Sequence, residues 1–176
     1  MPEGILKAHF ACFARYNHWA NRKLYAAVAQ LDFAAYTAPR TGFFPSIAKT
    51  LNHLIVTDRI WLARFEGLPQ PHKSLDELPH ADFGALEQAR ETLDQRILRF
   101  IAALTEAHLA EVLHYRSMAG EERATPLDAS LTHFFNHQTH HRGQAHGMLS
   151  GTRVAPPSLD MAAFYPEDAQ ATGSAA

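Results

Sequence analysis

Apolar residues recur at steps of three and four along four long stretches of the chain. In the first stretch the repeat runs through Phe10, Phe13, Leu24 and Val28. The four stretches cover residues 5–31, 45–66, 81–107 and about 127–150. This spacing places the apolar side chains on one face of an α-helix. The pattern therefore predicts four amphipathic helices.

Residues typical of helix ends and turns separate these stretches. Pro45 suits the first turn of the second helix, and Thr125, Pro126 and Asp128 together resemble the start of the fourth, with Thr125 as the cap. Residues 32–44 are predicted to form a loop. Apolar residues followed by a glycine in residues 108–124 are compatible with a small β-hairpin.

These elements predict an all-α protein, a four-helix bundle with a small β-hairpin between the third and fourth helices. One domain is expected over residues 1–160. Residues 161–176 are expected to form a C-terminal tail that is partly flexible, since its end is rich in alanine, glycine and serine.

Composition and charge exclude several classes of protein. Sixteen lysines and arginines stand against 18 aspartates and glutamates, for a net charge of -2, so no nucleic-acid partner is expected. The N-terminus has no apolar run long enough for a signal peptide or a membrane span. The single cysteine, Cys12, cannot form an internal disulfide. We therefore expect a cytoplasmic protein without a membrane partner, and Cys12 as a core or boundary residue.

Histidine is unusually frequent, with 12 in the chain and five between His133 and His146. His137 and His141 are four residues apart, which places both imidazoles on one side of a helix, where they could bind one ion. A histidine-rich face exposed to solvent explains the same spacing. Gln138 follows His137, so the HExxH motif of zinc proteases is absent.

A third ligand would have to come from another helix, and His53 is the candidate. It is the only histidine of the second predicted helix. At 100° per residue, however, it lies about 140° from the centre of the main apolar face of that helix, whereas Asp58 lies nearer that centre. Either this helix is buried on two sides, or Asp58 is its inward polar group and needs a partner.

Three segments of the chain resemble the DinB/YfiT-like superfamily of metalloenzymes, the damage-inducible DinB family. They are residues 16–21 (YNHWAN), residues 50–54 (TLNHL) with Asp58 and Trp61, and residues 136–144 from Asn136-His137 through His141-Arg142-Gly143-Gln144. The likeness follows the same order over most of the chain, to about Asp160.

The resemblance implies a four-helix bundle in which His53, His137 and His141 bind one divalent transition metal. Zinc or nickel is expected first, with iron or manganese as alternatives. It also implies a homodimer. Relatives include transferases and isomerases that depend on bacillithiol, mycothiol or glutathione, so a small-molecule substrate and a low-molecular-weight thiol are the expected partners. Asn17 and Asp58 are candidates to hold the ligand histidines in place.

The ligand set suggests two functions. Three imidazoles leave one coordination position open, as in catalytic metal sites, which favours a metal-dependent S-transferase or isomerase that acts on small electrophiles. The alternative is a non-catalytic stress-response protein in which the metal is structural. A fourth protein ligand, such as Asp58 or His133, would favour the alternative.

Overall fold

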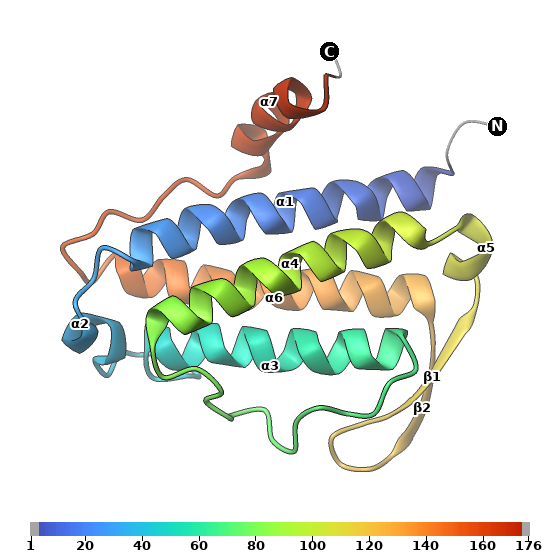
Figure 1. Cartoon of the computed structure of the whole chain (residues 1–176), viewed down its shortest axis with the longest axis horizontal. Coiled ribbons are helices and arrows are strands. Elements are labelled where there is room, and N and C mark those ends of the chain that lie inside the picture. Colours follow the sequence, from blue (N-terminus) through green and yellow to red (C-terminus); the bar gives the residue numbers. More distant parts are fainter. Residues whose placement is uncertain (1–3, 174–176) are drawn as a thin grey trace.

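Four long helices form the body of the protein in a computed structural model that describes residues 4–173. They are α1 (Ile5–Val28), α3 (Ile47–Phe65), α4 (Phe83–Ala103) and α6 (Leu127–Leu149). Helices α1 and α3 each pack against both α4 and α6 (Figure 1). The predicted helical class is confirmed. The observed helix ends lie within a few residues of the predicted ones, because the spacing of apolar residues within each helix can be read from that segment alone.

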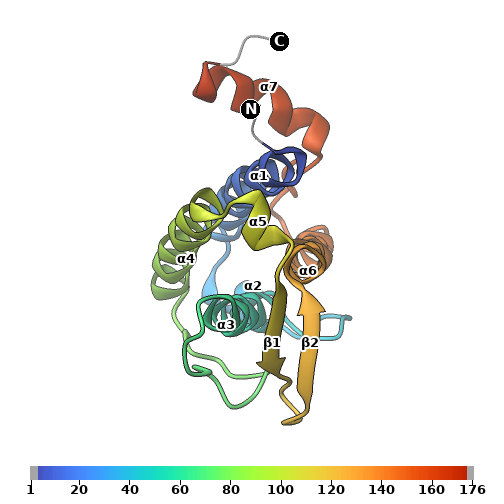
Figure 2. The same ribbon diagram turned by 90° about the vertical axis from the view of Figure 1, so that its right-hand side faces the viewer.

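Two short helices and a hairpin lie between the long helices. Helix α2 (Phe33–Thr37) lies between α1 and α3, and α5 (Glu106–Leu109) follows α4. Strands β1 (Val112–Arg116) and β2 (Glu122–Pro126) then form an antiparallel pair that contacts α6 (Figure 2). The hairpin is the one that the sequence predicted.

The start of α6 differs from the prediction. Thr125 pairs with Leu113 in the hairpin. The prediction that Thr125 caps α6 is therefore wrong. Pro126 occupies the N-cap position and makes no side-chain cap. By contrast, the side chain of Ser46 accepts a hydrogen bond from the Lys49 amide and begins α3, just after Pro45.

A further helix, α7 (Met161–Thr172), lies in the segment expected to be a partly flexible tail. It stands on the outer side of α1 (Figures 1 and 2). Phe164 is buried against Tyr16, and Arg15 donates to Asp168 at 2.8 and 2.9 Å. Apolar contact and an ion pair therefore hold this helix to α1, and residues 174–176 of the expected tail lie outside the described residues.

A network of buried polar side chains crosses the middle of the helical body. Arg90 of α4 donates to Asp58 of α3 at 2.6 Å and lies 2.8 Å from Asp94. Asn17 of α1 donates to Asp94 at 3.2 Å and accepts from Arg142 of α6 at 2.6 Å. Two carboxylates, two guanidinium groups and Asn17 thus connect all four long helices. Asp58 is the inward polar group that the sequence allowed, and its partner is cationic.

None of the helices within residues 4–173 combines the length and the apolarity that crossing a membrane requires.

Candidate metal centre

His53 enters the site from the most deeply buried helix. Every residue from Thr50 to Asp58 is buried, and His53 itself is 4% exposed. Helix α3 is therefore covered on more than one side, which explains how His53 and Asp58 can both be buried although they lie on different faces. The sequence left these as two alternatives, and the structure combines them.

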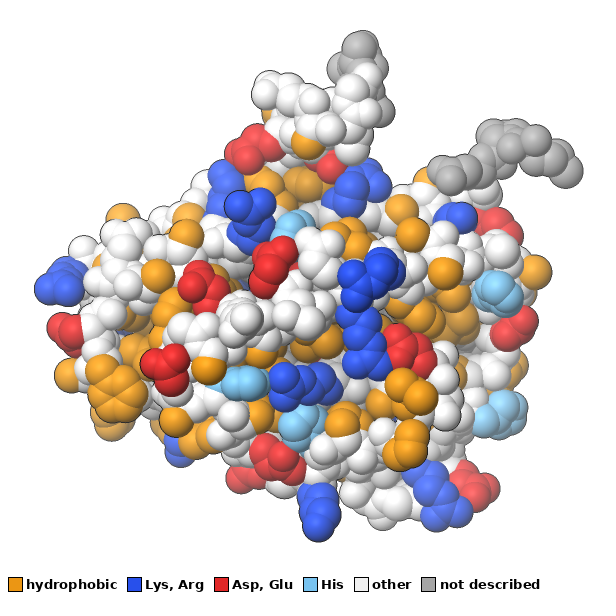
Figure 3. Space-filling view, in the orientation of Figure 1, with side chains coloured by type: hydrophobic (Ala, Val, Ile, Leu, Met, Phe, Trp, Pro, Cys, Tyr) orange, Lys and Arg blue, Asp and Glu red, His pale blue; other side chains and the backbone are white. Residues whose placement is uncertain are grey.

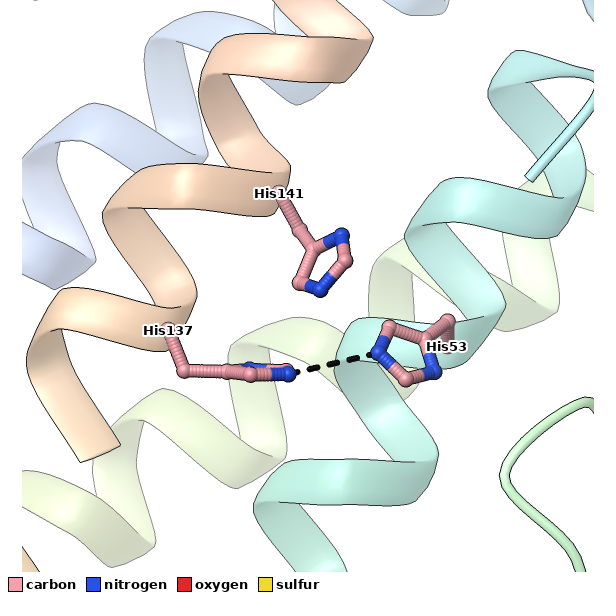
Figure 4. A group of neighbouring side chains, drawn as sticks. All are labelled: His53, His137 and His141. Atoms are coloured by element: carbon pink, nitrogen blue, oxygen red, sulfur yellow. Dashed lines mark hydrogen bonds between the residues drawn. The ribbon is translucent and has the colours of Figure 1, made fainter. Parts of the chain in front are cut away.

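His137 and His141 enter from α6, one helical turn apart, and face His53 (Figure 4). The Nε2 atoms of His53 and His137 are 3.3 Å apart, and the ring centroids of His141 lie 4.4 Å from His137 and 4.5 Å from His53. One nitrogen of each ring lies within 4.8 Å of one nitrogen of both others. The structure thus brings together the three residues that the resemblance selected.

Hydrogen bonds at the outer ring nitrogens determine which nitrogen carries the proton in two of these histidines. His53 Nδ1 lies 2.9 Å from the Leu75 carbonyl, which only accepts, so Nδ1 carries the proton and Nε2 keeps its lone pair. His141 Nδ1 lies 2.9 Å from Gln144 Oε1, which likewise leaves Nε2 without a proton. A neutral ring whose outer N–H is bonded to an oxygen acceptor is the usual arrangement of a metal-binding histidine.

The surroundings keep the imidazoles uncharged at neutral pH. Burial lowers the pKa of His53 to about 4, although its bond to the Leu75 carbonyl works in the opposite direction. Burial and the neighbouring histidines lower the pKa of His137 to about 3, and burial also lowers the pKa of His141. Because a metal binds the neutral ring, the site needs no deprotonation step at pH 7.

Phe44 forms an apolar wall beside the histidines. It is buried in the segment before α3, and its ring stacks on His53 at 4.1 Å between centroids. It also meets His141 edge-on at 5.7 Å. An aromatic wall of this kind limits rotation of the two rings and lowers the local polarity.

The residues expected to support the site lie elsewhere. Asp58 and Asn17 bond to the buried arginines rather than to the ligand histidines, which corrects that expectation. His133 is exposed, and its ring centroid lies 5.9 Å from that of His137, outside the cluster. Cys12 packs beside Tyr16 and Phe164, where burial raises the pKa of its thiol, so it is no candidate nucleophile.

Three groups that the sequence did not single out support the histidines instead. These are the Leu75 carbonyl, the Gln144 side chain and the Phe44 ring. Gln144 belongs to the motif that carries the resemblance, and its position three residues after His141 could have indicated its role. The Leu75 group is a backbone atom and leaves no signal in the sequence.

The fold and the site together define a helical protein with a buried three-histidine cluster suited to a divalent metal. Comparison with known proteins identifies the family: the DinB family model matches residues 6–171, and the chain belongs to that family. It is 25% identical over 157 residues to Protein DinB of Bacillus subtilis (strain 168), covering 85% of this chain and 90% of the relative.

The structural comparison supports the fold. The crystal structure of a DinB-like protein from Bacillus cereus ATCC 10987 superimposes with a TM-score of 0.62 and 13% sequence identity. The match covers 80% of this chain and 90% of that one. The helical arrangement is therefore shared with that protein despite the low identity.

Proposed function

We propose that this protein binds one divalent transition metal through His53, His137 and His141, with zinc or nickel preferred, and catalyses the transfer of a small thiol to an electrophile. The observation that carries the metal site is the pair of Nε2 atoms of His53 and His137, 3.3 Å apart. With its Nδ1 proton donated to Leu75, His53 directs the lone pair of its Nε2 at this contact. A proton on His137 Nε2 satisfies the contact in the metal-free protein, and a zinc ion about 2.0–2.1 Å from each nitrogen spans the same distance.

The number of ligands favours catalysis over a structural role. Within residues 4–173, the metal-binding cluster contains three side chains. Asp58, one candidate for a fourth ligand, is committed to Arg90, and His133 lies outside the cluster. Structural zinc sites usually have four protein ligands, whereas three nitrogen ligands leave a position for an exchangeable molecule.

The chain's own groups would prepare such a position for chemistry. A bound metal would supply Lewis acidity, which stabilises the thiolate form of a thiol at neutral pH. Leu75 and Gln144 hold two imidazoles in the tautomer that keeps Nε2 free. Phe44 excludes water from one side of the site, which strengthens electrostatic interactions there.

The test separates metal binding from catalysis. Protein purified without added metal should carry up to one transition metal per chain by elemental analysis, and His137→Ala or His141→Ala should remove most of it. His114→Ala, at an exposed position of β1, is the matched control and should retain the metal. Equal metal content in all three variants would exclude the assigned site.

Catalysis is tested on the cobalt-substituted protein. Glutathione, cysteine or bacillithiol should produce an intense sulfur-to-cobalt charge-transfer band, and the native holoprotein should accelerate conjugation of that thiol to a chromogenic aryl halide. His53→Ala should abolish this rate. A spectrum that none of the three thiols changes would refute thiol transfer and leave the metal with a structural role.

A further inference from the structure

A cavity lies between α3, α4 and the segment of residues 66–82 that connects them. Its volume is about 560 Å³, and none of the three clustered histidines lines it. Most of its wall is apolar, with Leu68, Pro71 and Leu93 among the lining residues, and its polar groups include Arg59 and His80. Figure 3 shows basic and histidine side chains gathered on this face, between α3 and α4.

Arg59 is a half-buried cation whose charge is not neutralised. In the part of the chain that the structure describes, no carboxylate lies within ion-pair distance of it. Its side chain contacts the His80 Nε2 at 3.1 Å, and its burial together with the positive charge of Arg90 lowers its pKa. A guanidinium group in these surroundings gains from an anion that replaces the lost water.

His80 completes the polar end of the cavity. Its Nε2 accepts from one guanidinium nitrogen of Arg59, so the ring orients that side chain and leaves its other N–H groups available. Burial and the Arg59 charge both lower the pKa of His80. The backbone of His80 is fixed to α3, since its N–H donates to Asn52 Oδ1 at 3.0 Å and its carbonyl accepts from Asn52 Nδ2 at 2.9 Å. Asn52 is buried, so the two polar groups are held in place before any ligand arrives.

We propose that this cavity binds a small organic monoanion, a carboxylate attached to an apolar body, with the carboxylate held by Arg59, whose guanidinium group His80 keeps in place. One unneutralised positive charge matches one negative charge. The other arginine of the wall, Arg96, pairs with Glu66 and adds little net charge for a dianion such as phosphate. The apolar wall accounts for the preference for an organic ligand over an inorganic one. This site is independent of the proposed metal chemistry.

Benzoate is a suitable probe, with benzamide as its uncharged counterpart. In an NMR titration of the holoprotein, benzoate should shift the Arg59 side-chain N–H and the His80 backbone amide, and it should bind at least tenfold more tightly than benzamide or inorganic phosphate. Arg59→Met should weaken benzoate binding at least tenfold. Arg123→Met is the matched control, because Arg123 is exposed on the hairpin, and it should leave the affinity unchanged.

Two outcomes would overturn the proposal. If benzamide binds as well as benzoate, the cavity selects an apolar body and not an anion. This comparison uses the unchanged protein, so it does not depend on whether a variant folds. If His137→Ala abolishes the benzoate shifts, the carboxylate was bound at the metal and not beside Arg59. Retention of those shifts in His137→Ala, together with their loss in Arg59→Met, would establish the second site even if no thiol-transfer activity is found.

Discussion

Replacing Gln144 with leucine should weaken metal binding without removing a ligand. In the folded protein, Gln144 Oε1 lies 2.9 Å from His141 Nδ1, and its Nε2 lies 2.9 Å from the exposed His140. Leucine is similar in size and favours a helix, so the backbone of α6 should be preserved. The variant therefore removes the acceptor that fixes the His141 tautomer and leaves His53 and His137 intact.

The expected loss follows from the position of this single hydrogen bond. Partners of metal-binding histidines typically contribute 10- to 100-fold in metal affinity, which corresponds to about 1.4–2.7 kcal/mol. The upper part of the range applies if His141, freed from Gln144, takes the tautomer with its proton on Nε2 and must exchange it before binding. Competition between the protein and a zinc-binding dye at pH 7 measures the dissociation constant directly.

Two further variants make the result interpretable. Gln144→Glu keeps an acceptor next to His141 and adds a negative charge, so it should bind zinc at least as tightly as the parent protein. Gln95→Leu removes a glutamine of α4 whose side chain donates to Glu91 in the same helix, and it should have no effect. A Gln144→Leu dissociation constant within threefold of the parent value would refute the view that this bond prepares His141.

Three other perturbations have defined outcomes. Arg90→Met leaves Asp58 and Asp94 buried without their cation and should cost about 3–5 kcal/mol in urea unfolding; a loss below about 1 kcal/mol would contradict the network's role. Chelation should lower the thermal midpoint because the metal binds only the folded chain, and an unchanged midpoint after verified metal removal would disprove this linkage. After dialysis at pH values from 7 to about 5 the protein should still hold its metal, since the pKa of His53 in the folded protein is about 4 and that of His137 is about 3. The unfolded histidines take up protons near pH 6.5, so the apoprotein should lose stability as the pH falls from about 6.5 towards 4; metal loss already near pH 6.5 would contradict these shifts.

The long helices could be predicted from sequence because apolar spacing is local information. The ends of α1 and α3 fall within about three residues of the predicted positions. Helix α7 was not predicted, because it is short, contains Pro166 and is held by the distant partners Tyr16 and Arg15. The role of Thr125 was also misassigned, since pairing with Leu113 competes with capping.

The site also contains features that local sequence predicts and features that depend on distant contacts. His137 and His141 are neighbours by helix geometry alone, so their proximity follows from a spacing of four residues. His53 required the resemblance, because its position away from the main apolar face of α3 makes sense only when other elements cover that helix on several sides. The partner of Asp58 could not be identified, because Arg90 is 32 residues away and on another helix.

The contact between His53 and the Leu75 carbonyl has a consequence for how relatives are compared. The Leu75 side chain is 41% exposed, and its backbone oxygen makes the contact. Almost any amino acid at position 75 would therefore supply the same acceptor, and substitutions there would be silent for the metal site. Changes in the length of the 66–82 segment would move that oxygen. A relative that keeps all three histidines but has a shorter or longer connection here would carry the ligands with a differently oriented His53, a divergence that residue-by-residue comparison would miss.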